Sequence, residues 1–158
     1  MADATIRSAT AEDAESVAEV YLASRKAFLS FAPLKHSDQA VRRWVADRLI
    51  PLGGVIVAYD ADESVVGMMA LSRTEATGWI DHLYLLPTAV RQGLGTRLLE
   101  HAKATLGPPI RLYSFQANEG ARRFYERHGF QSVAFGDGSE NEEGCPDVLY
   151  EWVGARKR

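Results

Sequence analysis

Two kinds of hydrophobic pattern alternate along this chain. Short runs rich in β-branched and aromatic residues, bounded by glycine, proline or acidic turn residues, are typical of β-strands. Such runs predict strands at 5–8, 54–59, 65–71, 79–86, 110–115, 130–135 and 148–153. The fourth of these strands is followed by Pro87, which has no N–H group to donate to a neighbouring strand and therefore ends it.

Four other segments place apolar residues three and four positions apart, which is the spacing of one face of an α-helix. In chain order, the predicted helices are 11–28, a second that begins at 38 and is stopped by Pro51 and Gly53-Gly54, 94–106 and 119–128. Thr10 and Asn118 can cap the first and last of these helices, and either Ser37 or Asp38 can cap the second. Gly129 suits the left-handed residue that commonly follows a helix.

The order of these elements predicts a mixed α/β domain. Antiparallel strands come first, and a strand–helix–strand–helix–strand half follows them. The chain has 158 residues, of which 46% are hydrophobic, so it is long enough to bury one core. We therefore expect residues 1–158 to form a single domain.

The composition argues against several classes of function. A net charge of −3 makes broad binding to nucleic acid unfavourable. Cys145 is the only cysteine, so an intrachain disulfide is impossible, and the cysteine and histidine spacing is not that of a metal site. The N-terminus lacks a basic segment before an apolar run, and no apolar stretch is long enough to span a membrane. We expect a cytoplasmic protein.

The join between the fourth predicted strand and the third predicted helix carries the strongest chemical signal. Gly93 and Gly95 stand there with one residue between them. The first turn of a helix has N–H groups without internal partners, at the positive end of the helix dipole, and glycines let a phosphate approach them. Arg91 and Arg97 add positive charge, which favours a phosphate cradle. The alternative is a turn that needs glycine for geometry alone.

Two other phosphate-binding loops are excluded by the residues at this join. A P-loop needs a Gly-Lys pair, and the chain contains none. A dinucleotide-binding fingerprint needs a third glycine three positions after Gly95, where Leu98 stands instead.

The segment Arg-Gln-Gly-Leu-Gly-Thr, from Arg91 to Thr96, resembles the acetyl-CoA loop of the GCN5-related N-acetyltransferase (GNAT) family. The family pattern is Arg/Gln-x-x-Gly-x-Gly/Ala. Gly93 and Gly95 fit it, and Val90 departs from it at the position where Arg or Gln is usual. The departure leaves the mechanism intact, because the backbone N–H groups are the chief ligands of the pyrophosphate.

A second block, from Asn118 to Phe130, is similar to the GNAT signature Asn-x-x-Ala-x-x-Phe-Tyr-x-x-x-Gly-Phe. The two blocks occur in the order found in the family. The resemblance implies the GNAT fold, in which a central, mostly antiparallel sheet is flanked by about four helices. It also implies that the fourth and fifth strands splay apart and open a cleft.

The resemblance further implies acetyl-CoA as co-substrate and names the residues that would bind it. The central strand would pair with the pantetheine arm like an additional strand, through Leu83, Tyr84 and Leu85. The glycine loop would hold the pyrophosphate through Arg91, Gln92, Gly93, Leu94, Gly95 and Thr96. Asn118 and Tyr125 would also contact CoA. No metal is implied.

Tyr125 is the predicted general acid. It lies seven residues after Asn118, which is nearly two helical turns, so both side chains face the same way. A phenol has an ordinary pKa of about 10, so it is protonated at neutral pH and can donate to a departing thiolate. The resemblance places a general-acid tyrosine at this position. The alternative is that Phe124 and Tyr125 form a packed aromatic pair.

The general base has more than one candidate. Asp81 and His82 lie on the central strand and face opposite sides if the strand is regular. Asp81 would share a face with Trp79 and Leu83, which we expect to point into the cleft, and it is the predicted base. A β-bulge would change this count in favour of His82, and water is a third candidate.

The acceptor pocket of the family usually forms between its first two helices. In this chain His36 lies in that segment, and Phe28, Phe31 and Trp44 are candidates for the apolar wall.

These observations predict an N-acetyltransferase that moves an acetyl group from acetyl-CoA to a primary amine by direct transfer in a ternary complex. Cys145 lies outside both motif blocks, so nothing marks it as a covalent nucleophile. One alternative is a non-catalytic acyl-CoA-binding module. Another is an enzyme that acetylates the amine of a protein or an aminoacyl-tRNA. The acceptor is left open, and a homodimer is possible.

Overall fold

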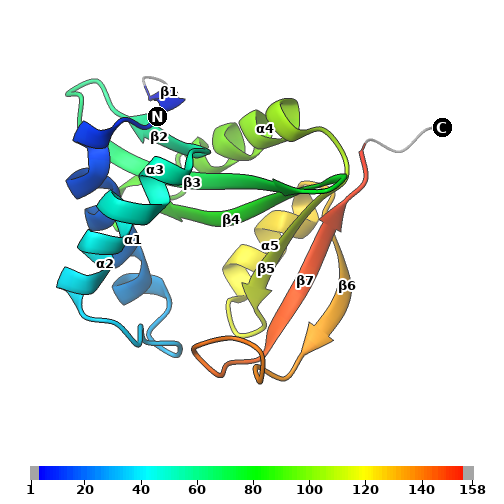
Figure 1. Ribbon diagram of the computed structural model, residues 1–158. Helices are drawn as coiled ribbons and strands as arrows, with labels where there is room; N and C mark the ends of the chain where they lie inside the picture. The colour runs from blue at the N-terminus through cyan, green and yellow to red at the C-terminus, as the bar shows by residue number, and fades with distance from the viewer. Residues whose placement is uncertain (1–3, 155–158) are drawn as a thin grey trace.

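The structure, a computed structural model, describes residues 4–154, which form a seven-stranded sheet in the order β1-β2-β3-β4-β5-β7-β6 (Figure 1). The strands are β1 (Thr5–Ser8), β2 (Val55–Tyr59), β3 (Val65–Thr74), β4 (Thr77–Leu85), β5 (Ile110–Phe115), β6 (Gln131–Gly136) and β7 (Asp147–Trp152). Every neighbouring pair is antiparallel except β4 and β5. The predicted mixed α/β fold with a mostly antiparallel sheet is confirmed.

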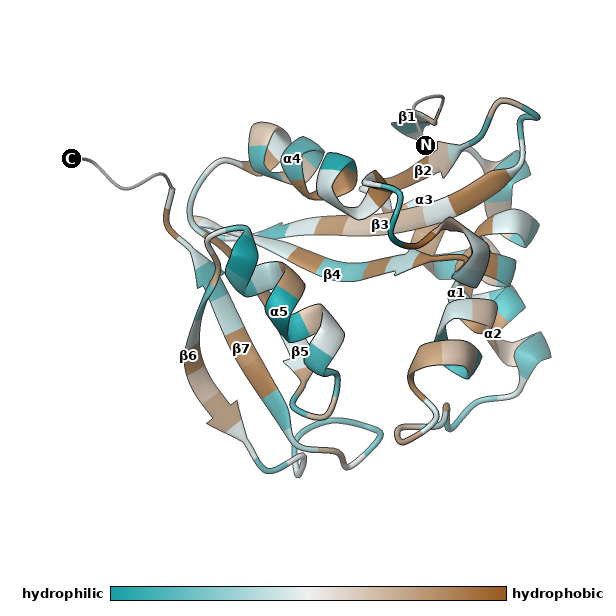
Figure 2. Ribbon diagram, turned by 180° about the vertical axis from the view of Figure 1, so that it is seen from behind, coloured by the Kyte–Doolittle hydropathy of each residue, from teal (hydrophilic) through white to brown (hydrophobic). Residues whose placement is uncertain are grey.

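The helices cover both faces of this sheet. They are η1 (Ala11–Asp13), α1 (Ala14–Phe28), α2 (Asp38–Trp44), η2 (Val45–Leu49), α3 (Ile50–Leu52), η3 (Pro87–Ala89), α4 (Leu94–Leu106) and α5 (Glu119–Arg127). Helices α1 and α2 pack on one face of β2, β3 and β4, and α4 and α5 lie on the opposite side of the sheet (Figures 1 and 2). The expected capping residues Ser37 and Asn118 each accept a hydrogen bond from the first turn of their helix.

The sheet forks between β4 and β5. These parallel strands pair only where Gly78 meets Ile110 and Trp79 meets Arg111. Beyond that point they diverge, so that β4 stays with the N-terminal half of the sheet and β5 with β6 and β7 (Figure 1). The expected splay of the fourth and fifth strands is therefore present, and it leaves one edge of β4 without a strand partner.

A β-bulge in β4 changes the faces that were expected from a regular strand. Opposite β3, His82 pairs with Ala70 and Ile80 pairs with Leu71, so Asp81 is the extra residue. Ile80 consequently packs in the same core as Leu83, on the α4 side. The alternation that was expected to place Asp81 on the face of Leu83 is interrupted at Asp81 itself, and this is the bulge that was expected to favour His82.

The second predicted helix continues past Pro51 and ends at Gly53, the second of its two expected stop signals. The helix continues through the π-helical turn η2, where the Ile50 N–H donates to the carbonyl of Val45, and it ends at Gly53, whose φ is 90°. Proline lacks an N–H group and crowds the carbonyl four residues before it in an α-helix. The wider π-turn just before Pro51 relieves this conflict.

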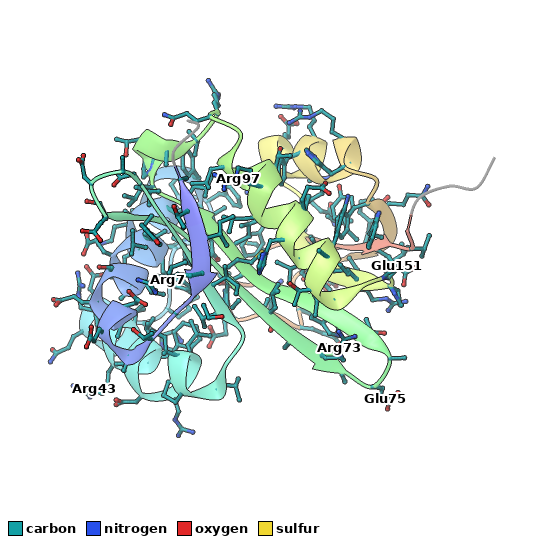
Figure 3. All side chains as sticks on the ribbon, turned by 90° about the horizontal axis from the view of Figure 1, so that it is seen from above. Arg7, Arg43, Arg73, Glu75, Arg97 and Glu151 are labelled. Atoms are coloured by element: carbon teal, nitrogen blue, oxygen red, sulfur yellow. The ribbon has the colours of Figure 1, made fainter. Side chains whose placement is uncertain are left out.

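Helix α4 is tied to the sheet at both ends, which fixes the direction of its N-terminus. Arg97, in its first half, donates to the carbonyl of Ala4 beside β1 (Figure 3). Arg73, near the end of β3, donates to the carbonyl of Leu106 at 3.0 Å, at the C-terminal end of the helix. Leu98 and Leu99 are fully buried between these two anchors. The start of α4 is thus held beside the fork.

No helix within residues 4–154 combines the length and the apolar character needed to cross a bilayer.

Candidate functional site

A cavity of about 1280 Å³ occupies the fork between β4 and β5. Its walls come from both halves of the sheet, from α1 and α5, from the glycine-containing loop before α4, and from the loop 137–146 between β6 and β7. Pockets for one small molecule usually measure about 300–1,000 Å³. The fork therefore has room for two ligands side by side.

Helix α4 begins beside this cavity without a side-chain cap. Gly93 precedes the helix in the left-handed region, with φ 81°, and as a glycine it has no side chain to cap the first turn. Helices α2 and α5 differ, because each has a capping side chain. Gly93, Gly95 and Thr96 line the cavity. The first-turn N–H groups of α4 are therefore available to an anion, at the positive end of the helix dipole.

Three arginines line the cavity at this end, namely Arg91, Arg123 and Arg127. Within residues 4–154, none of them forms an ion pair with a carboxylate. Arg97 was expected to add charge here as well, but it turns to the Ala4 carbonyl and does not line the cavity. The unpaired arginines make this end of the cavity suitable for a polyanionic group such as a pyrophosphate.

The backbone geometry and packing of the loop also explain why glycine stands at positions 93 and 95. A Cβ atom on Gly95 would lie 3.3 Å from Cζ of Phe124, so the Phe124 ring would have to shift by a few tenths of an ångström to accept a side chain there. Gly93 has open space around it and needs only its positive φ. The case for an anion site therefore rests on the uncapped helix and the arginines, together with the glycines that keep the backbone exposed to the cavity.

A side-chain network ties the start of α4 to the end of α5. Nδ1 of His128 lies 2.9 Å from the carbonyl of Phe124, and Nε2 lies 3.1 Å from the hydroxyl of Thr96. Because a carbonyl can only accept, His128 donates from Nδ1, and Nε2 accepts the hydroxyl proton of Thr96. Gln92 likewise uses its side chain within the loop, donating to the carbonyl of Thr88 at 3.1 Å. The predicted loop residues are thus held in place by protein contacts.

The open edge of β4 runs along the cavity. Leu83, Tyr84 and Leu85 line it, and they lie beyond the last residues that pair with β5. One edge of this segment pairs with β3, while the other faces the fork. An extended ligand can pair with the N–H and C=O groups of such an edge as an additional strand would. Leu94, by contrast, is buried in the core, so only its backbone can serve a ligand.

Tyr125 and Asn118, both on the α5 side, line the same cavity. Tyr125 is 8% exposed, and burial raises the pKa of its phenol, so the hydroxyl is protonated at neutral pH. No hydrogen bond among the described residues uses this hydroxyl, whereas the hydroxyl of the neighbouring Tyr150 is bound by Arg122 and donates to Glu126. The Tyr125 proton is available to a ligand.

Asp81 and His82 both line the cavity but differ in surroundings. Asp81, at the bulge, is exposed and forms no ion pair with another described residue. His82 packs edge-on against the rings of Tyr21 and Trp44, with centroids 5.5 and 5.6 Å away. Burial lowers the pKa of His82, so its imidazole is neutral at pH 7. The structure brings both base candidates to the cavity.

The end of the cavity farther from the glycine loop contains a buried arginine. Arg25 of α1 is 6% exposed, and its guanidinium donates to the hydroxyl of Tyr84 at 3.1 Å and to the carbonyl of Ala32 at 3.1 Å. It also forms an ion pair with Glu143, at 2.9 Å. One side chain therefore connects α1, β4 and the loop 137–146.

We call the loop 137–146 the strap, because it meets the segment between α1 and α2 at the open end of the fork (Figures 1 and 2). Besides the pair between Arg25 and Glu143, an oxygen of Glu142 lies 3.0 Å from Nε2 of His36. The thiol of Cys145 approaches the carbonyl of Phe31 at 3.5 Å. These contacts connect the two arms of the fork at its open end.

Sequence reasoning missed Arg25, Glu143 and Tyr113 as cavity residues. Arg25 left a signal, because it falls four positions after Tyr21 on the apolar face of α1, where a charge is unexpected. No feature of the sequence alone indicates that Glu143 and Tyr113 line the cavity. Among the described residues, no cluster of three or more histidine, cysteine or carboxylate side chains is arranged to hold a metal ion.

Comparison with known proteins is consistent with this geometry. Residues 51–132 match the family model described as an acetyltransferase (GNAT) domain. No curated protein matches the chain. Solved structures with a similar fold include apo YjaB from Escherichia coli, with a TM-score of 0.77 and 24% identity over 96% of this chain and 99% of that one.

Two further structures were solved with ligands. The PaiA N-acetyltransferase from Thermoplasma acidophilum, in complex with coenzyme A, has a TM-score of 0.74 and 21% identity over 96% of this chain and 99% of that one. Naa50 from Arabidopsis thaliana, in complex with the bisubstrate analogue CoA-Ac-MVNAL, has a TM-score of 0.70 and 20% identity, also over 96% and 99%. At these identities the likeness concerns the fold.

Proposed function

The chain belongs to the GNAT acetyltransferase family, and from that premise we propose that it transfers an acetyl group from acetyl-CoA to a primary amine, directly, in a ternary complex. We further propose that residues 1–158 form one acetyltransferase domain. A cytoplasmic location and a homodimer remain predictions from the sequence.

One observation carries the proposal most directly. The cavity in the fork joins an uncapped helix N-terminus flanked by arginines, an unpaired strand edge and a tyrosine with an available proton. The pyrophosphate of acetyl-CoA would bind at the helix N-terminus, and its amide-bearing pantetheine arm would pair with the strand edge. Its thioester sulfur would then lie beside the tyrosine. The remaining volume would take the acceptor, which supports attack without a covalent acetyl-enzyme.

The binding roles follow from these features. The first-turn N–H groups of α4, in the loop Arg91, Gln92, Gly93, Leu94, Gly95 and Thr96, would hold the pyrophosphate. The backbone of Leu83, Tyr84 and Leu85 would pair with the pantetheine arm. The side chain of Asn118 already caps α5 through its oxygen, so its amide N–H₂ group would be the part that contacts CoA.

The chemical roles fall to Tyr125 and Asp81. The acceptor nitrogen would attack the thioester carbonyl carbon, forming a C–N bond, and the C–S bond would break. Tyr125 would give its proton to the departing thiolate, and Asp81 would take the proton that the amine loses, directly or through water. His82 is the alternative base, since the β-bulge at Asp81 favours it and its neutral imidazole can accept a proton.

The decisive experiment measures the acetyl-CoA-dependent release of free thiol with a panel of primary amines, in the wild type and in Tyr125→Phe. We expect turnover in the wild type and a 10²- to 10⁴-fold lower kcat in the variant, because a positioned general acid contributes about that much. Acetyl-CoA binding, measured by calorimetry, should stay within about twofold. Equal turnover in both proteins would contradict the role of Tyr125, and binding without turnover of any amine would favour a non-catalytic acyl-CoA-binding module.

A further inference from the structure

Exposed aromatic side chains lie along the cavity between the apex of the fork and the strap. Phe28 is 44% exposed, Phe31 is 39% exposed and Tyr113 is 61% exposed. Phe28 and Tyr113 line the cavity, and Phe31 packs edge-on against Phe115, which also lines it, with ring centroids 5.8 Å apart. Aromatic surface left in water costs free energy, and a contiguous patch of it commonly marks a binding site.

The Tyr113 ring is held in a fixed orientation. It stacks on Trp79 with ring centroids 5.9 Å apart and an angle of 15° between the planes. Trp79 lies at the last pairing of β4 with β5, so the stack stands at the apex of the fork. Two rings fixed in this way form a flat, preorganised surface that loses little side-chain entropy when a second planar group packs on it.

The charges near these rings favour a cationic acceptor. Asp81 lines the cavity on the adjacent strand and forms no ion pair with another described residue. Of the four strap carboxylates that line the cavity, Glu142 and Glu143 are bound by His36 and Arg25, whereas Asp137 and Glu140 form no ion pair with another described residue. An ammonium group that meets Asp81 therefore does not have to compete for a paired carboxylate.

The strap limits how long the acceptor can be. The ion pair between Arg25 and Glu143 and the contact between Cys145 and Phe31 close the open end of the fork. An acceptor seated between Phe28 and Tyr113 would meet the strap beyond its ring. A compact molecule fits this enclosure better than a group that continues as a polymer chain.

We propose that the acceptor is a small arylalkylamine, whose aromatic ring packs between Phe28, Tyr113 and Phe115 and whose ammonium group meets Asp81. The inference rests on the proposed acetyl transfer and names its substrate class. It separates this chain from enzymes that act on polyamines or on protein N-termini, because those acceptors lack the ring or continue past it.

The test compares amines of matched length with saturating acetyl-CoA. The panel is 2-phenylethylamine, 2-cyclohexylethylamine, n-butylamine, spermidine and a short peptide with a free N-terminus. We expect kcat/KM for 2-phenylethylamine to exceed kcat/KM for 2-cyclohexylethylamine by about threefold to tenfold, since aromatic pairs gain about that much beyond buried area. The difference between 2-phenylethylamine and n-butylamine should be larger than that. A preference for spermidine, the peptide or the saturated ring would overturn the proposal.

Two variants test whether the preference for 2-phenylethylamine depends on the Tyr113 ring. Tyr113→Ala should lower kcat/KM for 2-phenylethylamine about tenfold while changing that for n-butylamine less than twofold. As a control, Val133→Ala removes a 49% exposed apolar side chain outside the cavity, and it should change kcat/KM for neither amine. Equal losses with both amines in Tyr113→Ala would indicate a structural role for the ring and would overturn the proposal.

A binding measurement separates this inference from the proposed function. Calorimetry on the protein saturated with CoA measures 2-phenylethylamine binding without any chemistry. Saturable binding that Tyr113→Ala weakens would support the pocket even if no amine were acetylated, in which case the proposed function alone would fail. Absence of saturable binding by 2-phenylethylamine would overturn the inference, whether or not other amines are acetylated.

Discussion

The guanidinium of Arg25 lies 2.9 Å from a carboxylate oxygen of Glu143, and the two residues are 118 positions apart in the chain. Arg25 belongs to α1 and Glu143 to the strap, so the pair joins the two halves of the forked sheet. Both side chains are largely buried, at 6% and 14% exposed. This one contact closes the cavity at the end proposed for the acceptor.

Removing the carboxylate from this pair should destabilise the fold. Glu143→Ala leaves the guanidinium of Arg25 buried without its anion, and we expect the free energy of unfolding to fall by about 2–4 kcal/mol. Glu142→Ala is the matched control, because its pair with His36 is exposed and should contribute less than about 0.5 kcal/mol. Urea denaturation of both variants measures the difference, and equal losses would contradict a buried, stabilising pair.

The carboxylate of Asp13 should make stability depend on pH in the acid range. The hydrogen bond from Arg7, opposed in part by burial, lowers the pKa of Asp13 from 3.8 to about 2. Because this pKa is lower in the folded state, the stabilisation is complete above about pH 4 and is lost as the pH falls through about 2. Since the Arg7 side chain is 43% exposed and solvent screens the pair, we expect this stabilisation to be about 1 kcal/mol.

The comparison for Asp13 is with Asp13→Asn. Urea denaturation of both proteins from pH 7 to pH 2 should show a stability difference that is constant above about pH 4.5 and shrinks below it. A difference that stays constant down to pH 2 would contradict the lowered pKa.

Charge at the start of α4 should control acetyl-CoA binding. Gly93 has positive φ and open space around it, and asparagine and aspartate tolerate this backbone conformation better than other side chains. Gly93→Asp and Gly93→Asn therefore add similar volume and differ in charge. We expect the aspartate to weaken acetyl-CoA binding at least tenfold more than the asparagine, because a carboxylate repels the pyrophosphate. Calorimetry at two salt concentrations tests this, and the difference should shrink at high salt.

Asp81 and His82 can be distinguished by their effects on the pH profile. We expect Asp81→Asn to lower kcat/KM about 10²-fold, as the loss of a general base does. His82→Gln should cost less than tenfold and leave the acidic limb of kcat/KM in place. Since burial lowers the pKa of His82, a histidine base would place that limb below pH 6.5. Loss of the limb in His82→Gln would therefore reassign the base to His82.

Local sequence determined most of the elements and the position of the cofactor loop. The strands from Thr5 to Ser8 and from Ile110 to Phe115 and the helix from Leu94 to Leu106 have the predicted bounds. Gly129 has the left-handed backbone expected after a helix. These features depend on residues a few positions apart, so the chain order contains the information needed to predict them.

Tertiary structure decided the details of the site. The bulge at Asp81 depends on the register with β3, and a strand read alone appears regular. Arg25 meets Glu143, and Phe28 comes to share a cavity with Tyr113, only after the fork brings distant segments together. Tertiary packing decides which carboxylates have no ion-pair partner and which aromatic rings remain exposed. The sequence predicts the proposed CoA site, because its residues fall in two short blocks of the chain and the end of one strand, whereas the proposed acceptor site is assembled from α1, β4, β5 and the strap.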